Sequence, residues 1–226
     1  MSSIHAGKLL ATAGLVMVAL AGADAARASE DRQWYVTGTA GFVTQSDQRL
    51  DYTRPGVAGV ISPTLPLDTG ILTGAAIGRH FGDAWRVEAE FMYQSVDHPN
   101  FTLVTGTAGD GNYASTTVAV NALRDFDLFG SPSAKTYVGL GAVYATEVDV
   151  DFESGGVEKS FSGSGTGVQA LLGARYTFGE RTFVDAGVRY LLVSGVELDA
   201  EEGGAVGRIK ADYEPLAVTV SFGWRF

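Results

Sequence analysis

The sequence contains no cysteine, few prolines and no run of basic residues. Its 226 residues include 6 prolines, 16 Lys and Arg and 26 Asp and Glu, which gives a formal net charge of −10. The absence of cysteine excludes disulfides, thiolate metal sites and cysteine nucleophiles. The acidic balance indicates no nucleic-acid partner, because such proteins need clustered Lys and Arg to displace the counterions around phosphates.

Long apolar segments are also missing after the first residues. Beyond Gln33 no apolar run reaches the ~18 residues that indicate a transmembrane helix. The charged fraction of 19% is low for a soluble protein, yet the mean hydropathy of +0.10 is too weak for a bundle of membrane helices. Neither of these two common classes fits the composition, and the length suits one domain of barrel or sandwich type.

The first residues have the features of an export signal. Residues 9–22 read LLATAGLVMVALAG, and two A-x-A sequences follow, which end at Ala25 and Ala28. The apolar run is shorter than the ~20 residues that a spanning helix needs, so we expect a cleaved signal peptide over residues 1–28. Cleavage after Ala28 is favoured over Ala25, and a single barrel domain is predicted over residues 29–226.

The remaining chain alternates with the two-residue period of β-strands. In Trp85–Ser95, for example, Trp85, Val87 and Ala89 share one face while Arg86, Glu88 and Glu90 share the other. Alternation predicts eight strands, over Trp34–Thr44, Ile71–Phe81, Trp85–Ser95, Tyr113–Leu123, Thr136–Val148, Val168–Phe178, Val184–Leu192 and Leu216–Phe226. Short links alternate with long ones, and the long ones cover residues 45–70, 96–112, 149–165 and 194–212. This pattern predicts an all-β, eight-stranded antiparallel up-and-down transmembrane β-barrel with short periplasmic turns and long extracellular loops.

The position of the aromatic residues indicates which face contacts lipid. Aromatic side chains lie on the apolar face near the strand ends, as in the belts at the two headgroup levels of a membrane. The charged face then points into the lumen, where isolated charges would be costly. We therefore expect hydrogen-bonded lumen ion pairs among Arg86, Glu88, Glu90, Arg175, Asp185, Arg189 and Arg225. An ion path or proton relay is the alternative interpretation of the same residues.

Several segments resemble small outer-membrane barrels of the opacity/OmpA-type (OmpX-like) family. They are Trp34–Gly38, Gly78–Phe81 with Trp85–Glu90, Tyr137–Tyr144 and the ending Val220–Phe226. The resemblance implies a bacterial outer-membrane location with the loops at the cell surface. It also implies that Phe222, Trp224 and Phe226 form the signal read by the barrel-assembly machinery, and that outer-membrane lipid and lipopolysaccharide surround the barrel.

The sequence indicates a non-enzymatic barrel with a structural or surface-interaction role, without cofactor or metal. His80 and His98 are expected at opposite membrane faces, so they cannot share one catalytic site. Acidic clusters fall in the third and fourth long links, at Asp149, Asp151, Glu153 and Glu158 and at Glu197, Asp199, Glu201 and Glu202. These clusters are candidates for contact with a host or extracellular ligand, or with lipopolysaccharide through divalent cations. The alternatives are a small-solute, porin-like channel and an outer-membrane lipid-modifying enzyme.

Overall fold

The computed structural model describes residues 33–226 except 57, 83, 100, 104–105, 110, 129, 155–156 and 203–205. All the regular secondary structure in this part of the chain consists of β-strands. No helix among the described residues has the length and apolar character to cross a membrane. The predicted all-β class is confirmed. The proposed signal peptide and its cleavage site lie outside the described residues.

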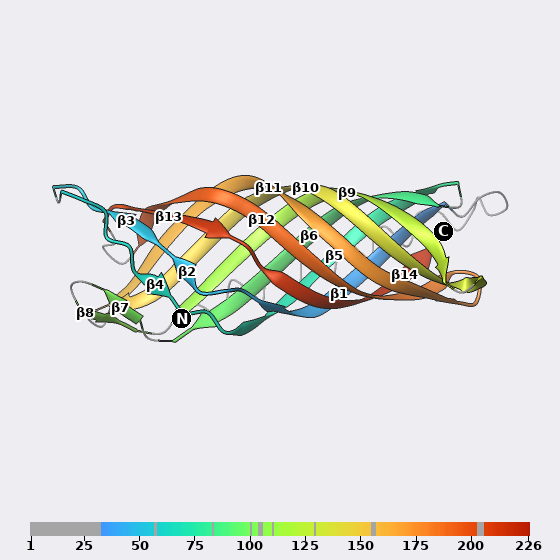
Figure 1. Cartoon of the computed structure of the whole chain (residues 1–226), viewed down its shortest axis with the longest axis horizontal. Coiled ribbons are helices and arrows are strands. Elements are labelled where there is room, and N and C mark those ends of the chain that lie inside the picture. Colours follow the sequence, from blue (N-terminus) through green and yellow to red (C-terminus); the bar gives the residue numbers. More distant parts are fainter. Residues whose placement is uncertain are drawn as a thin grey trace.

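Eight long antiparallel strands form a closed ring. In ring order they are β1 (Trp34–Thr44), β5 (Thr69–Phe81), β6 (Trp85–His98), β9 (Gly111–Leu128), β10 (Ser131–Ser154), β11 (Val157–Phe178), β12 (Thr182–Glu202) and β14 (Leu216–Arg225). Each strand pairs with the next, and β14 pairs with β1 to close the ring (Figure 1). Closure satisfies the backbone N–H and C=O groups within the ring, as a membrane-spanning sheet requires. The predicted eight-stranded barrel is confirmed.

Short turns join the strands at one end of the barrel. Gly82, Gly130 and Gly179 lie in these turns with φ angles of 64°, 71° and 72°. Residues other than glycine rarely adopt such positive φ angles, which explains why glycine occupies these turn positions. The backbone N–H of Phe226 donates to the carbonyl of Trp34 over 2.9 Å, so the ring begins and ends at this same end. As the sequence analysis predicts, we assign this end to the periplasm, because short turns and both chain ends lie on that side in barrels of this kind.

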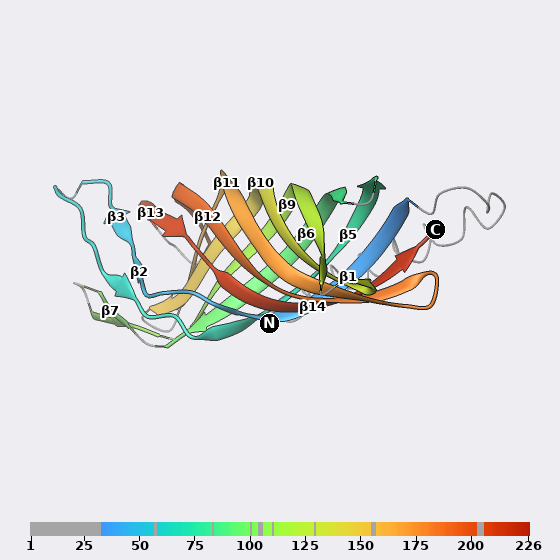
Figure 2. The ribbon, with the colours of Figure 1, turned by 45° about the vertical axis from the view of Figure 1, so that its right-hand side comes forward.

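Six short strands extend the opposite, extracellular end. They are β2 (Gln48–Arg49), β3 (Asp51–Thr53), β4 (Thr64–Leu65), β7 (Phe101–Leu103), β8 (Gly106–Ala108) and β13 (Arg208–Tyr213). β2 pairs with β4, β7 with β8, and β3 with β13. Figures 1 and 2 show these elements projecting away from the end that carries the C-terminus.

Two of the links that we expected to be irregular loops are regular hairpins. β10 and β11 remain paired as far as Ser154 and Val157, and β12 and β13 are paired from Val193–Tyr213 to Asp199–Arg208. Residues 149–165 and 194–212 therefore belong largely to strands that extend beyond the membrane. The cause is visible in the sequence, because apolar and acidic residues continue to alternate there with the period of a strand.

β10 and β12 each contain an irregularity that reverses which residues of the alternating sequence face inward in these extensions. The register shifts between Ala145 and Val148 in β10, and between Val193 and Val196 in β12. Because side chains alternate with a period of two, one extra residue moves every following side chain to the other face. Beyond the shifts, Val148 and Val196 are buried in the interior, and the neighbouring Glu147 is exposed.

The outward face of the membrane-spanning part is apolar. Leu140, Val168 and Val218 are 71%, 57% and 59% exposed, which is unusual for aliphatic side chains unless lipid covers them. Exposed aromatic side chains lie at both rims, with Trp85 and Trp224 near the periplasmic turns.

Candidate functional site

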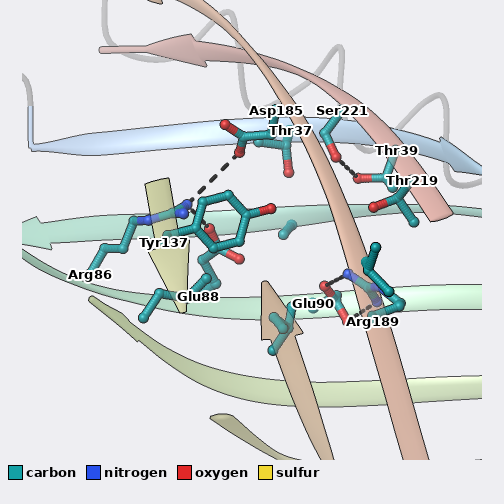
Figure 3. A pocket seen from close by; sticks show the side chains of 14 residues that line it. Thr37, Thr39, Arg86, Glu88, Glu90, Tyr137, Asp185, Arg189, Thr219 and Ser221 are labelled. Atoms are coloured by element: carbon teal, nitrogen blue, oxygen red, sulfur yellow. Dashed lines mark hydrogen bonds and ion pairs between the residues drawn. The ribbon is translucent and has the colours of Figure 1, made fainter. Parts of the chain in front are cut away.

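The periplasmic half of the barrel interior is built around Arg86. Its side chain is 1% exposed, and its Nη1 lies 2.7 Å from Glu88 Oε1 while its Nε lies 3.0 Å from Asp125 Oδ1. Asp185 Oδ2 is 3.9 Å from the same guanidinium (Figure 3). The Tyr137 ring covers one face of the guanidinium, with 4.5 Å between Cζ and the ring centroid. Three carboxylates therefore surround one buried cation.

Arg175 forms a second ion pair on the same level. Its Nε and Nη2 donate to the two carboxylate oxygens of Asp185, each over 2.7 Å. Its guanidinium lies 3.8 Å from the centroid of the Phe183 ring and 5.0 Å from that of Tyr35. The Tyr35 hydroxyl in turn donates to Glu88 over 2.5 Å, which joins the two ion pairs into one network. Such bidentate geometry gives a buried ion pair the additional hydrogen bonds that it needs.

A third ion pair lies nearer the middle of the barrel. Arg189 Nη1 and Nη2 donate to the two oxygens of Glu90, each over 2.7 Å (Figure 3). The Gln169 amide donates to Glu90 over 3.1 Å and to Asn121 Oδ1 over 2.6 Å. This layer connects β6, β9, β11 and β12 across the lumen.

The structure places six of the seven proposed lumen residues in these three groups, and Arg225 departs from the expectation. Its Nη2 donates to Thr177 Oγ1 over 3.1 Å and its guanidinium lies 5.3 Å from the Phe183 ring centroid. Among the described residues no carboxylate lies within 4.0 Å of it, because Asp185 already pairs with Arg175 and Arg86. Asp125 was not among the lumen residues that we expected from the sequence. Its inward position follows if the predicted strand Tyr113–Leu123 is extended by two residues with the same alternation.

Little space remains between the side chains of this network. A cavity of about 20 Å³ is lined by Arg86, Glu88, Glu90, Arg189 and other inward residues, including Thr39 and Ser221 (Figure 3). Such a volume accommodates about one water molecule. The hydroxyls of Thr39 and Ser221 lie 2.7 Å apart at its wall. The network therefore fills the lumen at this level.

The extracellular half of the interior is apolar, which the sequence analysis did not predict. One buried cluster includes Val143, Val150, Phe161, Leu198 and Ile209, and a second one consists of Val43, Leu72, Met92, Val96 and Ala217. Leu50 and Leu65 from the segment between β1 and β5 join the first cluster and are 2% and 0% exposed. The interior thus changes from charged to apolar along the barrel axis.

The two histidines of the described chain lie far apart. His80 pairs in register with Arg86 near the periplasmic end of β6, whereas His98 ends that strand on the other side. Twelve residues of β-strand span about 40 Å. His98 is 1% exposed, and its Nε2 lies 2.7 Å from the backbone oxygen of Asp151. A side chain buried in this way is not accessible to a substrate.

The acidic clusters lie on the outward face of the extracellular extensions. Arg208 contacts Asp199 and Glu197 over 2.7 and 2.9 Å. Partial burial, together with the neighbouring charges of Asp151 and Glu147, raises the pKa of Asp149 to about 7. No group of three or more His, Cys, Asp or Glu that could hold a metal ion occurs in the described part of the chain.

The three residues of the proposed assembly signal lie at the end of the barrel wall. Phe222, Trp224 and Phe226 are 54%, 43% and 40% exposed and share the outward face of β14 and its continuation. They are therefore accessible from outside the barrel, and their part in assembly stays a prediction.

A closed eight-stranded barrel with an apolar outer band and aromatic rims belongs to the class of outer-membrane β-barrels. Residues 13–226 match the family described as outer membrane protein beta-barrel domain, and the chain belongs to this family. The predicted resemblance and the location in the bacterial outer membrane are confirmed. No curated protein matches the sequence.

Solved structures share this fold at low sequence identity. OprG from Pseudomonas aeruginosa is 18% identical with a TM-score of 0.61, over 86% of this chain and 96% of OprG. The protease OmpT from Escherichia coli is 6% identical with a TM-score of 0.51, over 89% of this chain and 99% of OmpT. Neisserial surface protein A is 16% identical with a TM-score of 0.45, over 83% of this chain and 95% of that protein. Since a protease shares the fold, the fold alone does not decide whether this chain is an enzyme.

Proposed function

We propose that this protein is a non-enzymatic, non-conducting barrel that binds ligands at the cell surface through the acidic extensions of β10, β11, β12 and β13. The observation that carries the proposal is the filled interior. Buried ion pairs occupy its periplasmic half and packed apolar side chains its extracellular half. Among the described residues, these extensions form the longest paired strands at the extracellular end, and they carry the acidic clusters.

The filled interior argues against a small-solute channel. A hydrated ion or solute would have to cross the layer formed by Arg189, Glu90 and Gln169 and then the apolar cluster around Val143 and Leu191. The first step breaks a bidentate ion pair, and the second one removes water from the solute. An eight-stranded barrel has an interior just wide enough for its own side chains, so no free path remains beside them.

The position of the histidines argues against an enzyme. His80 packs against Tyr35, with 5.1 Å between the ring centroids, and approaches Arg175 rather than a hydroxyl nucleophile. His98 is buried beside the Asp151 backbone. Neither ring is placed as a general base next to an accessible nucleophile, which general acid–base catalysis requires.

The charge of the extensions favours a cationic ligand, or lipopolysaccharide bridged by divalent cations. Glu147, Glu153 and Glu158 are exposed on the β10–β11 hairpin, and Asp199 and Glu197 are exposed on β12. Carboxylates outnumber Lys and Arg on these hairpins. Hard divalent cations prefer oxygen ligands, and phosphate groups of lipopolysaccharide supply the opposite half of such a bridge.

Two measurements on the refolded barrel test the proposal. We expect no conductance steps in planar bilayers, and binding to lipopolysaccharide vesicles that is strong with Mg²⁺ and weak with EDTA. A trimmed barrel, in which Asn-Gly replaces residues 146–164, is expected to fold but to lose this binding. The matched control Glu147→Gln/Glu153→Gln/Glu158→Gln keeps the hairpin and removes three of its five carboxylates, and we expect a similar loss.

Two results would contradict the proposal. Stepwise conductance of the full-length barrel would support the channel. Mg²⁺-dependent binding that persists in both variants would remove the role of the acidic hairpin.

A further inference from the structure

The outer face of the barrel carries an arginine between two aromatic rings at its periplasmic rim. Trp34 of β1 pairs in register with Arg79 of β5, and Phe81 follows two residues later on the same face. The Arg79 Cζ lies 5.5 Å from the Trp34 ring and 5.4 Å from the Phe81 ring. Stacking of this kind holds a guanidinium in a fixed plane.

The same arrangement recurs two strands further around the barrel. Trp85 of β6 pairs in register with Arg124 of β9, and Phe126 follows two residues later. The Arg124 Cζ lies 5.6 Å from the Trp85 ring and 5.3 Å from the Phe126 ring. We call the two arrangements the arginine clamps. Their repetition in both spacing and residue type points to a common ligand rather than to local packing.

Neither guanidinium is neutralised within the described part of the chain. Both arginines are exposed, and neither has a carboxylate within 4.0 Å there. Arg79 donates to Gln33 Oε1 from Nε and Nη2, over 3.2 and 3.0 Å, whereas Arg124 makes only its two ring contacts among these residues. Within these residues Arg124 therefore keeps its donors for a phosphate, in the fork geometry that matches it, whereas Arg79 keeps Nη1 and the second N–H of Nη2.

The barrel wall above the clamps is apolar and shallowly indented. A concavity of about 680 Å³ is lined by Ile77, Ala89, Phe91, Val120 and Ala142, among other residues. Ile77 lies two residues from Arg79 and Val120 lies four residues from Arg124, which correspond to about 7 and 14 Å along the strands. The small side chains of Ala89 and Ala142 let an acyl chain approach the backbone.

We propose that the arginine clamps bind the headgroup phosphodiesters of glycerophospholipids in the periplasmic leaflet, with an acyl chain in the adjacent concavity. The level of the clamps places them at the headgroups, because aromatic belts mark this depth. Charge complementarity selects the phosphate, and the apolar wall selects a lipid over a free anion. A lipid with net negative charge, such as phosphatidylglycerol, is preferred over phosphatidylcholine, since choline already neutralises its own phosphate. The site is independent of the surface function proposed above.

Tryptophan fluorescence tests this inference, because two of the three tryptophans belong to the clamps. A protein with Trp85 alone (Trp34→Phe/Trp224→Phe) is reconstituted in phosphatidylcholine bilayers that contain brominated phosphatidylglycerol or brominated phosphatidylcholine. Quenching reports which lipid occupies the site. We expect about fivefold enrichment of phosphatidylglycerol, since one arginine near a membrane surface contributes about that factor. In Arg124→Gln we expect the two brominated lipids to quench equally, without enrichment of phosphatidylglycerol. Arg124→Lys is expected to show an intermediate enrichment.

A protein with Trp224 alone is the matched control. Trp224 lies at the same rim, with Arg181 5.8 Å from its ring, but among the described residues Arg181 contacts this one ring instead of lying between two, and no residue of β12 or β14 lines the concavity. Equal enrichment at Trp224 and Trp85 would show general attraction to a basic rim and overturn the clamps. Unchanged enrichment in Arg124→Gln, or displacement of the lipid by excess inorganic phosphate, would overturn them as well. The heat-dependent shift of folded protein on gels verifies that each variant is folded.

Discussion

The ion pair between Glu90 and Arg189 offers a sharp test of how the lumen is stabilised. The Glu90 side chain is buried, the Arg189 side chain is 11% exposed, and two hydrogen bonds of 2.7 Å join them. Removing one partner of a buried pair leaves an uncompensated charge and costs about 3 to 5 kcal/mol, whereas removing the second partner as well adds no further uncompensated charge. We expect Glu90→Gln and Arg189→Met each to lower the free energy of unfolding by about 3 kcal/mol, and the double variant to lower it by about the same amount as one of them.

The double-mutant cycle is measured by urea unfolding of the four proteins in phosphatidylcholine vesicles. The coupling free energy is then about 3 kcal/mol in magnitude. The pair of Lys135 and Asp127 at the periplasmic rim is a control, because it is 3.7 Å apart and partly exposed. Its coupling is expected below about 1 kcal/mol. Additive losses at Glu90 and Arg189 would refute the reasoning, because they would mean that each charge is stabilised independently of the other.

Three further predictions concern other parts of the barrel. Because the pKa of Asp149 is raised to about 7, the contribution of this carboxyl group to stability is fully present below its ordinary pKa and is lost as the pH rises through 7. Asp149→Asn should therefore stabilise the extension at pH 8, by about 1 kcal/mol after solvent screening, with little effect at pH 4, as denaturant titrations at both values would show. Phe226→Ser should reduce insertion into the outer membrane more than refolding in detergent; equal losses would give it a purely structural role. A cysteine placed at Arg49 should react with a membrane-impermeant reagent in intact cells and one at Glu180 should not; the reverse result would invert the topology.

The sequence predicts the membrane-spanning ring well because each strand there follows one rule. Apolar residues face lipid, polar residues face the lumen, and the period is two throughout. Trp34–Thr44 was located to the residue, and the periplasmic ends at Phe81 and Trp85 were also correct. The pairing of Arg189 with Glu90, which lie on β12 and β6, depends on the ring register that brings these strands to opposite walls of the lumen, and alternation alone cannot supply this register.

The extracellular half was predicted less well because apolar residues face inward and acidic residues face outward there, the reverse of the membrane-spanning part. After Ala145 the acidic residues face outward and Val148, Val150 and Phe152 face inward. The sequence of these residues alternates clearly, but the length and acidity of the segment favoured a loop. A change of phase in an alternating pattern indicates a bulge, and this signal could have located the strand extension.

The inverted extension also means that one chain folds against two different solvents. Side chains such as Phe161, Leu198 and Ile209 leave water when the extension forms, whereas Leu140 and Val218 of the barrel wall remain in contact with lipid. Removal of apolar surface from water carries a large heat-capacity change, and this change is concentrated in the extracellular half. Cooling weakens hydrophobic association in water, so the extension is the cold-sensitive part of a barrel whose wall is held by closed backbone pairing. The stability of the extracellular extension therefore depends on temperature differently from the stability of the membrane-spanning barrel.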